Sequence, residues 1–165
     1  SDSLQGDSIL RNIYKKLGVE SSFFGTTLLL KKIELPLPAY IALDLSDAPD
    51  IAQTIVVSCL GLKIDCDLTG LNTLKIKETD RLLALKNEIK KLGTELKITD
   101  NSLHLKNAVS LNSDVHIATY NDHRMAMAFA PLALRTSLYI ENAEVVSKSY
   151  PDFWKDLKSL GFKVE

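Results

Sequence analysis

Apolar residues recur at helical spacing in five stretches of the chain. In Ser8–Leu17, Leu82–Leu92 and Phe153–Leu160 they form one stripe, which is typical of a helix lying on a core. Ile51–Leu60 is apolar almost all round, so we expect a buried helix there, ended by Gly61. The remaining helix opens at Asn121 and contains Pro131, which should kink it or remove a hydrogen bond.

Short β-type runs fill the segments between these helices. Gly25 and Asp100-Asn101 are the turn residues of two expected hairpins. An apolar, strand-like run also precedes Lys75. The predicted strands are Val19–Phe24, Thr26–Ile33, Ala39–Leu45, Lys63–Leu68, Glu95–Thr99, Leu103–Leu105, Val115–Ala118, Leu138–Ile140 and Phe162–Val164. Helices and strands together predict a mixed α/β or α+β fold.

Two series of landmarks recur with a period of roughly 70 residues. Gly18, Gly93 and Gly161 each end a helix and lead into a strand, and they are 75 and 68 residues apart. The helix starts at Asp50 and Asp122 are 72 residues apart. This predicts a repeated unit of two helices and four strands, divided at about 1–45 (partial), 46–114 and 115–165. The chain is therefore expected to be part of a longer protein.

The composition is that of an ordinary globular domain. Of 165 residues, 45% are hydrophobic and 25% charged, and the net charge is −1. Such a chain has no overall field to recruit nucleic acid or an anionic membrane, so neither is expected as a partner. The longest apolar run, Thr54–Leu62, is too short to cross a bilayer. Ser1–Ser8 has no signal-peptide core, and Cys59 and Cys66 have apolar neighbours, which predicts reduced thiols in a cytoplasmic protein.

The densest charge lies in one run that precedes the Leu82–Leu92 helix: Lys75-Ile76-Lys77-Glu78-Thr79-Asp80-Arg81, with Thr79 or Asp80 as the expected N-cap. A helix N-terminus attracts anions, and Lys77 and Arg81 would strengthen that attraction. Glu78 would weaken a simple anion site. A carboxylate between two cations and a bound anion is more typical of an acid/base group. The plainer alternative is a solvated helix start, with ion pairs worth under ~1 kcal/mol each.

Three more predicted helix starts carry charge. They are Asp50, the run Asp122-His123-Arg124, and Lys148, which precedes the expected N-cap Ser149 and its reciprocal partner Asp152. Equivalent turns of a repeat fold tend to gather on one face. Their cations and carboxylates would then suit a reaction on a doubly anionic small molecule. Taken singly, each has a structural alternative: a helix cap, a local ion pair, a structural histidine or a surface lysine.

Four motifs, in chain order, resemble those of the 5-enolpyruvylshikimate-3-phosphate synthase family. Three resemble its C-terminal signatures: Lys77-Glu78-Thr79-Asp80-Arg81-Leu82, Asn121-Asp122-His123-Arg124-Met125-Ala126-Met127 and Lys148-Ser149-Tyr150-Pro151-Asp152-Phe153. Asp47-Ala48-Pro49-Asp50 resembles a further motif, and the match runs from Gln5-Gly6-Asp7 onward. Because four motifs occur in order at plausible spacing, a chance match is a poor explanation.

The resemblance implies both a fold and a reaction. Each of two domains would contain three βαβαββ units, with helices inside and sheets outside, and residues 1–165 would be most of the C-terminal domain. The implied reaction transfers the enolpyruvyl group of phosphoenolpyruvate to the 5-hydroxyl of shikimate 3-phosphate and releases phosphate. The resemblance implies no cofactor and no metal, a monomeric parent protein, and a missing N-terminal domain that supplies the other half of the site. This chain alone is therefore expected to be inactive.

The same motifs imply a role for each charged residue. Asp50 would hold the shikimate hydroxyls and accept a proton, and Glu78 would transfer a proton near the phosphoenolpyruvate methylene. Lys77 would contact shikimate 3-phosphate. The implied phosphoenolpyruvate ligands are Arg81, Arg124 and Lys148, with His123 and Asp122 nearby.

One position departs from the family pattern, and two other functions stay open. Where many members place a substrate-binding asparagine, this chain has Thr73, with Asn72 beside it. The contact with shikimate 3-phosphate would then fall to Thr73, and Asn72 stays open as the alternative. One alternative is the related transferase that acts on UDP-N-acetylglucosamine, but it relies on a reactive loop cysteine, and neither Cys59 nor Cys66 occupies a plausible loop. The other is a non-catalytic anion-binding domain.

Overall fold

The structure, a computed structural model, describes residues 6–106 and 110–164, so Gln5 of the matched segment lies outside it. Its first part is a helix followed by a hairpin, as the sequence predicts. The elements are the 3-10 turn η1 (Gly6–Ile9), helix α1 (Leu10–Lys16) and the antiparallel strands β1 (Val19–Phe24) and β2 (Thr27–Lys32). Gly18 has φ +88°, a left-handed conformation that also recurs at Gly93 and Gly161. The three glycines that mark the repeat therefore share one backbone conformation.

The middle of the chain folds as one complete β-α-β-α-β-β succession. Its elements are β3 (Tyr40–Asp44), η2 (Pro49–Ile51), α2 (Ala52–Leu62), β4 (Asp65–Thr69), η3 (Asn72–Ile76), α3 (Arg81–Lys91), β5 (Leu96–Ile98) and β6 (Ser102–Leu105). The sheet order is β3-β4-β6-β5. β3 and β4 are parallel, whereas β6 is antiparallel to both of its neighbours.

The last part of the chain repeats the beginning of that succession. Its elements are β7 (Val115–Ile117), α4 (His123–Phe129), η4 (Ala130–Leu134), β8 (Leu138–Ile140), η5 (Ala143–Lys148) and α5 (Phe153–Ser159). β7 and β8 are parallel, as β3 and β4 are. The equivalent helices α2 and α4 therefore each join two parallel strands.

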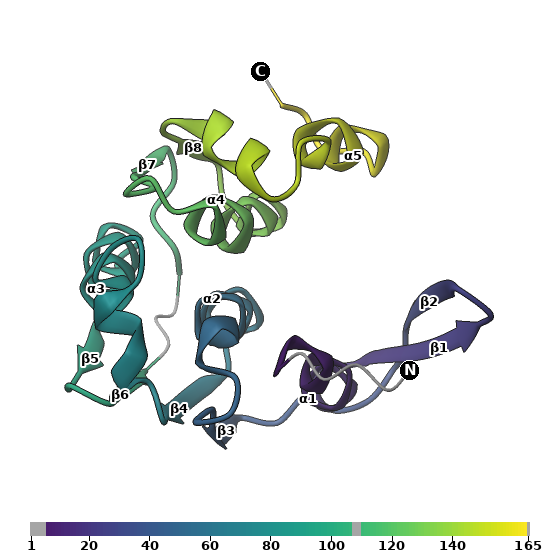
Figure 1. Ribbon diagram of the computed structural model, residues 1–165, viewed down its shortest axis with the longest axis horizontal. Coiled ribbons are helices and arrows are strands. Elements are labelled where there is room, and N and C mark those ends of the chain that lie inside the picture. Colours follow the sequence, from purple (N-terminus) through teal and green to yellow (C-terminus); the bar gives the residue numbers. More distant parts are fainter. Residues whose placement is uncertain (1–5, 107–109, 165) are drawn as a thin grey trace.

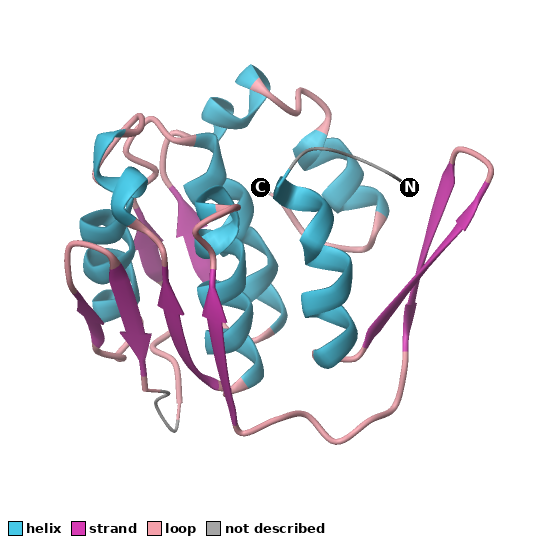
Figure 2. Ribbon diagram, turned by 60° about the horizontal axis from the view of Figure 1, so that its bottom comes forward, coloured by secondary structure: helices cyan, strands magenta, loops and turns pink. Residues whose placement is uncertain are grey.

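Most helices lie on the inner side of the strands, whereas α5 lies at the edge of the molecule (Figure 1). α2 occupies the centre, with α1, α3 and α4 around it. Its Ile55, Val56, Cys59 and Leu60 are at most 1% exposed, which is why this helix is apolar almost all round. Figure 2 shows the four-stranded sheet over one side of the helices, with the β1–β2 hairpin projecting away from them. Among the described residues, no helix is both long and apolar enough to cross a membrane.

Several local predictions were wrong. Residues 162–164 form no strand, whereas the strand expected before Lys75, Lys63–Leu68, is present as β4, and the 3-10 turn η3 separates it from the charged run. Gly61 lies inside α2, which instead ends at Leu62, with Lys63 at φ +60° as its C-cap. Pro131 follows α4, because the chain changes from α-helix to 3-10 helix at Ala130.

The predicted cap of the last helix was also wrong. Asp152 occupies the N-cap position of α5, without a side-chain cap bond, and Ser149 is the C-cap of η5. Lys148 therefore ends a 3-10 helix rather than preceding an α-helix. The reason is that Tyr150 continues the η5 turn by donating its N–H to the carbonyl of Val146 at 2.8 Å.

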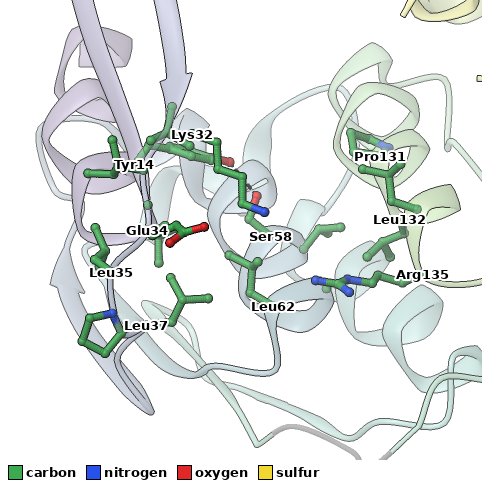
Figure 3. A pocket seen from close by; sticks show the side chains of 18 of the residues that line it. Tyr14, Lys32, Glu34, Leu35, Leu37, Ser58, Leu62, Pro131, Leu132 and Arg135 are labelled. Carbon is green, nitrogen blue, oxygen red and sulfur yellow. Dashed lines mark hydrogen bonds between the residues drawn. The ribbon is translucent and has the colours of Figure 1, made fainter. Parts of the chain in front are cut away.

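An apolar groove of about 1010 Å³ opens between α1, α2 and η4 (Figure 3). Leu37, Leu62 and Leu132 are among its lining residues, and Lys32, Glu34 and Arg135 stand at its polar edges. The lining contains none of the charged helix-start residues. This groove is therefore distinct from the candidate site.

Candidate active site

The charged helix starts meet around one buried side chain, that of Arg81. Arg81 is the first residue of α3 and is 1% exposed. Its guanidinium donates to three carboxylates: Nη1 to Asp50 Oδ1 at 2.9 Å, Nη2 to Glu78 Oε2 at 2.7 Å, and Nε to Asp122 Oδ2 at 2.6 Å. These acids come from η2, from the turn before α3 and from the turn before α4. The predicted convergence of the first three helix starts is therefore present.

Helix capping fixes two of these turns. Asp80, one of the two expected N-caps, accepts the backbone N–H of Leu83 at 3.0 Å and so sets where α3 begins. Asp122 caps α4 in the same way, through the N–H of Arg124 at 2.9 Å. Arg81 and Arg124 consequently stand in the first turn of their helices. The free N–H groups there favour anions.

Asp122 is the most enclosed carboxylate of the cluster. It is completely buried and depends on Arg81 for charge compensation. Gln53 of α2, also completely buried, points its Nε2 at Asp122 Oδ2 at 3.5 Å. Sequence reasoning missed Gln53, although a lone amide in an apolar helix was a signal. Gln53 ties the central helix to the cluster.

Asp50 faces three cations. Lys77 Nζ lies 3.1 Å from its Oδ1, Arg81 donates to the same oxygen, and Arg124 Nη2 lies 4.0 Å from its Oδ2. Arg124 Nη1 also donates to the Asp50 carbonyl at 3.1 Å. Partial burial would raise the pKa of Asp50. However, the hydrogen bond from Lys77 and the charges of Arg81, Lys77 and Arg124 together hold that pKa below its usual value.

The remaining predicted residues stand at different distances from this centre. Lys148 Nζ donates to the carbonyl of Asn121 at 3.2 Å, so its ammonium lies beside the turn that carries Asp122. His123 is half-buried at the first residue of α4. Thr73 and Asn72 are exposed in η3, and the Asn72 N–H bonds Asn101 Oδ1 at 3.0 Å. Among the described residues, no hydrogen bond joins Thr73 to the cluster.

The cluster has a buried centre, Arg81 with Asp122, and a partly exposed rim of four other charged side chains. The side chains of Lys77 and Asp50 are each 33% exposed, that of Arg124 27%, and that of Glu78 44%. Cations able to hold an anion thus lie beside carboxylates able to exchange protons. Within residues 6–106 and 110–164, no group of three or more His, Cys, Asp or Glu is placed to hold a metal ion.

Comparison with known proteins points to one family. The family model "EPSP synthase (3-phosphoshikimate 1-carboxyvinyltransferase)" matches residues 1–157. A 3-phosphoshikimate 1-carboxyvinyltransferase of Bacteroides fragilis is 43% identical over 173 residues, which cover 99% of this chain and 40% of the relative. One from Clostridium novyi is 34% identical, covering 97% of this chain and 36% of the relative. The chain thus spans about 40% of the length of such relatives.

Solved structures show the same fold. The structure of EPSP synthase from Acinetobacter baumannii aligns with a TM-score of 0.77 at 22% identity, over 93% of this chain and 39% of the other. The enolpyruvyl transferase NikO from Streptomyces tendae aligns with a TM-score of 0.65 at 15% identity, over 96% and 36%. The described chain therefore has the α+β fold of enolpyruvyl transferases.

Proposed function

The chain belongs to the EPSP synthase family, and we propose that the protein containing it transfers the enolpyruvyl group of phosphoenolpyruvate to the 5-hydroxyl of shikimate 3-phosphate, releasing phosphate. The observation that carries this proposal is the meeting of Asp50, Glu78 and Asp122 around Arg81, with Lys77 and Arg124 at the rim. Both substrates are anions, and the reaction moves two protons. Adjacent cations and carboxylates supply what such a reaction needs.

The cations would hold the substrates. Lys77 and Arg124 already make ion pairs with the Asp50 carboxylate, which stands where an anionic ligand could compete. Lys77 would take the phosphate of shikimate 3-phosphate. Arg124, Arg81 and Lys148 would take the carboxylate and phosphate of phosphoenolpyruvate. The buried Arg81 would act mainly through its charge, since its donors are already engaged by three acids.

The carboxylates would move the protons. Glu78 would give a proton to the phosphoenolpyruvate methylene carbon while the 5-hydroxyl oxygen forms a bond to the adjacent carbon. Asp50 would accept the hydroxyl proton. Phosphate would then leave together with one proton of the new methyl group, which would return to the Glu78 carboxylate, and the C=C bond of the enol ether would form. When a substrate anion takes the cations from Asp50, its carboxylate becomes a stronger base. Substrate binding would in this way prepare the proton acceptor.

The rest of the protein would complete the site. Because the chain spans about 40% of its relatives, we propose that the N-terminal part supplies further substrate ligands and closes over the cluster. Residues 1–165 would be most of a C-terminal domain, inactive alone, in a cytoplasmic and monomeric enzyme. A contact between Thr73 and shikimate 3-phosphate belongs to the same proposal.

The two alternatives receive less support. Cys59 and Cys66 are completely buried in α2 and β4, and a hydrogen bond between them, together with burial, raises the pKa of Cys66. Neither thiol is therefore suited to the reactive role that the UDP-sugar transferase needs. In a non-catalytic anion-binding domain, the half-exposed carboxylate of Glu78 beside the cations would only weaken anion binding.

The test is phosphate release from shikimate 3-phosphate and phosphoenolpyruvate. The chain should be assayed alone, then mixed with the N-terminal part of its parent protein, and the whole parent protein should serve as the positive control. We expect no phosphate release from the chain alone, and phosphate release from both the mixture and the parent protein. Release by the chain alone would contradict the half-site proposal. A folded parent protein that releases no phosphate would contradict the proposed reaction itself.

A further inference from the structure

A second buried carboxylate, that of Glu88, lies on α3 outside the arginine cluster. Its residue is 0% exposed. Burial of a charge needs compensating partners. Glu88 Oε2 accepts from Lys91 Nζ at 2.6 Å and from the backbone N–H of Ala118 at 3.1 Å, and Oε1 accepts from the Tyr120 hydroxyl at 2.7 Å. Two of its three partners therefore belong to the turn that leads into α4.

That turn has an unfavourable backbone. Tyr120 and Asn121 have φ +54° and +57°, two consecutive left-handed residues, neither of them glycine. L-residues adopt this conformation when surrounding contacts impose it. Glu88 bonds the turn at Ala118 and Tyr120, and the Asp122 N–H closes it on the Thr119 carbonyl at 2.9 Å. The partners of Glu88 thus hold the turn in the conformation that it has.

The Tyr120 hydroxyl is well placed to keep this role across the neutral pH range. Burial and the hydrogen bond to Glu88 raise the pKa of Tyr120, so its phenol remains a donor. Lys91 adds a link of its own, because its Nζ also donates to the His116 carbonyl at 2.9 Å. Helix α3 is therefore bonded both to strand β7 and to the turn that follows it.

The same turn carries groups of the candidate site. Asp122 bonds Arg81 and caps α4, whose second residue is Arg124. The Asn121 carbonyl accepts from Lys148. A change in the backbone of this turn would consequently move Asp122, its contact with Arg81, the start of α4 at Arg124 and the carbonyl that binds Lys148.

We infer that Glu88 and Tyr120 are positioning residues, which hold the 118–122 turn so that Asp122, Arg124 and Lys148 face the phosphoenolpyruvate site. This inference rests on the proposed function for its substrate. It assigns neither residue a contact with substrate. Their effect passes through the turn, so it should appear in the Michaelis constant (KM) for the anion that the turn helps to bind.

The test uses Tyr120→Phe in the whole parent enzyme, with Tyr139→Phe as the matched control. Tyr139 is 53% exposed on β8, and its variant loses the same hydroxyl without touching the turn. We expect Tyr120→Phe to raise KM for phosphoenolpyruvate about tenfold, or about 1.4 kcal/mol, with kcat within about threefold. Tyr139→Phe should change neither constant.

Glu88 variants give an independent series. Glu88→Leu removes both acceptor oxygens, whereas Glu88→Gln keeps one oxygen, either for the Tyr120 hydroxyl or for Ala118 and Lys91. We expect KM to rise in the order Tyr139→Phe, Glu88→Gln, Glu88→Leu. If Glu88 were needed only for folding, its variants would have a lower melting temperature. Their KM values, measured well below that temperature, would then not follow this order. If Glu88→Leu does not fold, Tyr120→Phe and Glu88→Gln still decide the matter.

Hydrogen–deuterium exchange in residues 118–125 separates this inference from the proposed reaction. Faster exchange in Tyr120→Phe together with raised KM supports the inference. Unchanged exchange, or faster exchange with unchanged KM, overturns it. If the folded wild-type enzyme releases no phosphate, the proposed function fails instead. Unchanged exchange in Tyr120→Phe would then also show that Tyr120 does not hold the 118–122 turn.

Discussion

Two networks of polar side chains in this molecule have similar connections, but only one of them is centred on a buried ion pair. In the arginine cluster, Arg81 joins Asp50, Glu78 and Asp122, and both Arg81 and Asp122 are buried. The second network crosses the four-stranded sheet. There, Ser102 Oγ lies 2.9 Å from His104 Nε2, and His104 Nδ1 lies 2.8 Å from Asp67 Oδ1.

The sheet network has the connectivity of a serine–histidine–aspartate relay. The Asp67 and His104 side chains nevertheless reach solvent, since they are 40% and 42% exposed. Ser102, 9% exposed, also shares its hydroxyl with Thr99 Oγ1 at 2.7 Å. Hydrogen bonds from Tyr40 and His104 lower the pKa of Asp67. This network braces neighbouring strands.

From this comparison we expect burial, rather than connectivity, to decide how much each network contributes to the free energy of unfolding. Water screens and replaces the partners of exposed charges, so each exposed pair is worth under ~1 kcal/mol. A buried charge that loses its partner has no such replacement. Mutations in the two networks should therefore have very different costs, although both contain comparable hydrogen bonds.

The largest effect on stability is expected from breaking the buried pair. Asp122→Ala leaves Arg81 buried without one of its acids and removes the cap of α4. It should lower the free energy of unfolding by about 3–5 kcal/mol, measured by urea unfolding. Arg81→Met with Asp122→Leu removes both charges and should cost less than Asp122→Ala alone. A double variant that is as unstable as the sum of its single variants would contradict this reading of the cluster.

The second-largest effect is expected from acid, which should reduce the contribution of Asp50 to the free energy of unfolding. The pKa of Asp50 is lower in the folded protein than in the unfolded chain, so the folded state binds fewer protons near pH 4. The stabilisation by Asp50 is therefore complete well above the unfolded pKa, about 3.9, and is lost as pH falls through the folded value. Between pH 6 and pH 3, urea midpoints should fall less steeply in Asp50→Asn than in the wild type. Equal slopes would show that Asp50 is not held as a carboxylate by its cations.

The smallest effect is expected at the sheet network. His104→Ala removes an exposed partner of Asp67, and solvent can replace that partner. We expect a loss of under ~1 kcal/mol in the same unfolding measurement. A loss comparable to that of Asp122→Ala would mean that exposure does not indicate how much these networks contribute to the free energy of unfolding.

The sequence predicted the helices and most strands because their signals are local. Ile51–Leu60 is buried as its all-round apolar pattern requires, and the repeated glycines all adopt the left-handed conformation. The errors fall where non-local contacts decide. Gly61 was expected to end the central helix, yet it lies inside α2, where a side chain at that position would meet Leu132 of η4.

The candidate site was predictable in its residues but not in its bonding. Charge at helix starts identified Arg81, Asp50 and Asp122, because anions and capping acids favour such positions. No local pattern indicates that Arg81 is buried and shared by three carboxylates. Gln53 and Glu88 were missed, since a single polar residue in a helix looks the same whether its partner is water or another turn.

One paired kinetic measurement tests most directly whether the arginine cluster carries the chemistry. The kcat for phosphate release by the whole parent enzyme would be compared between Glu78→Gln and His104→Gln at saturating substrate, with substrate binding measured separately. We expect Glu78→Gln to lower kcat by roughly 10²–10⁴-fold while binding is spared, as loss of an acid/base group does, and His104→Gln to leave kcat unchanged. Near-wild-type turnover in Glu78→Gln would contradict the assignment of proton transfer to this cluster.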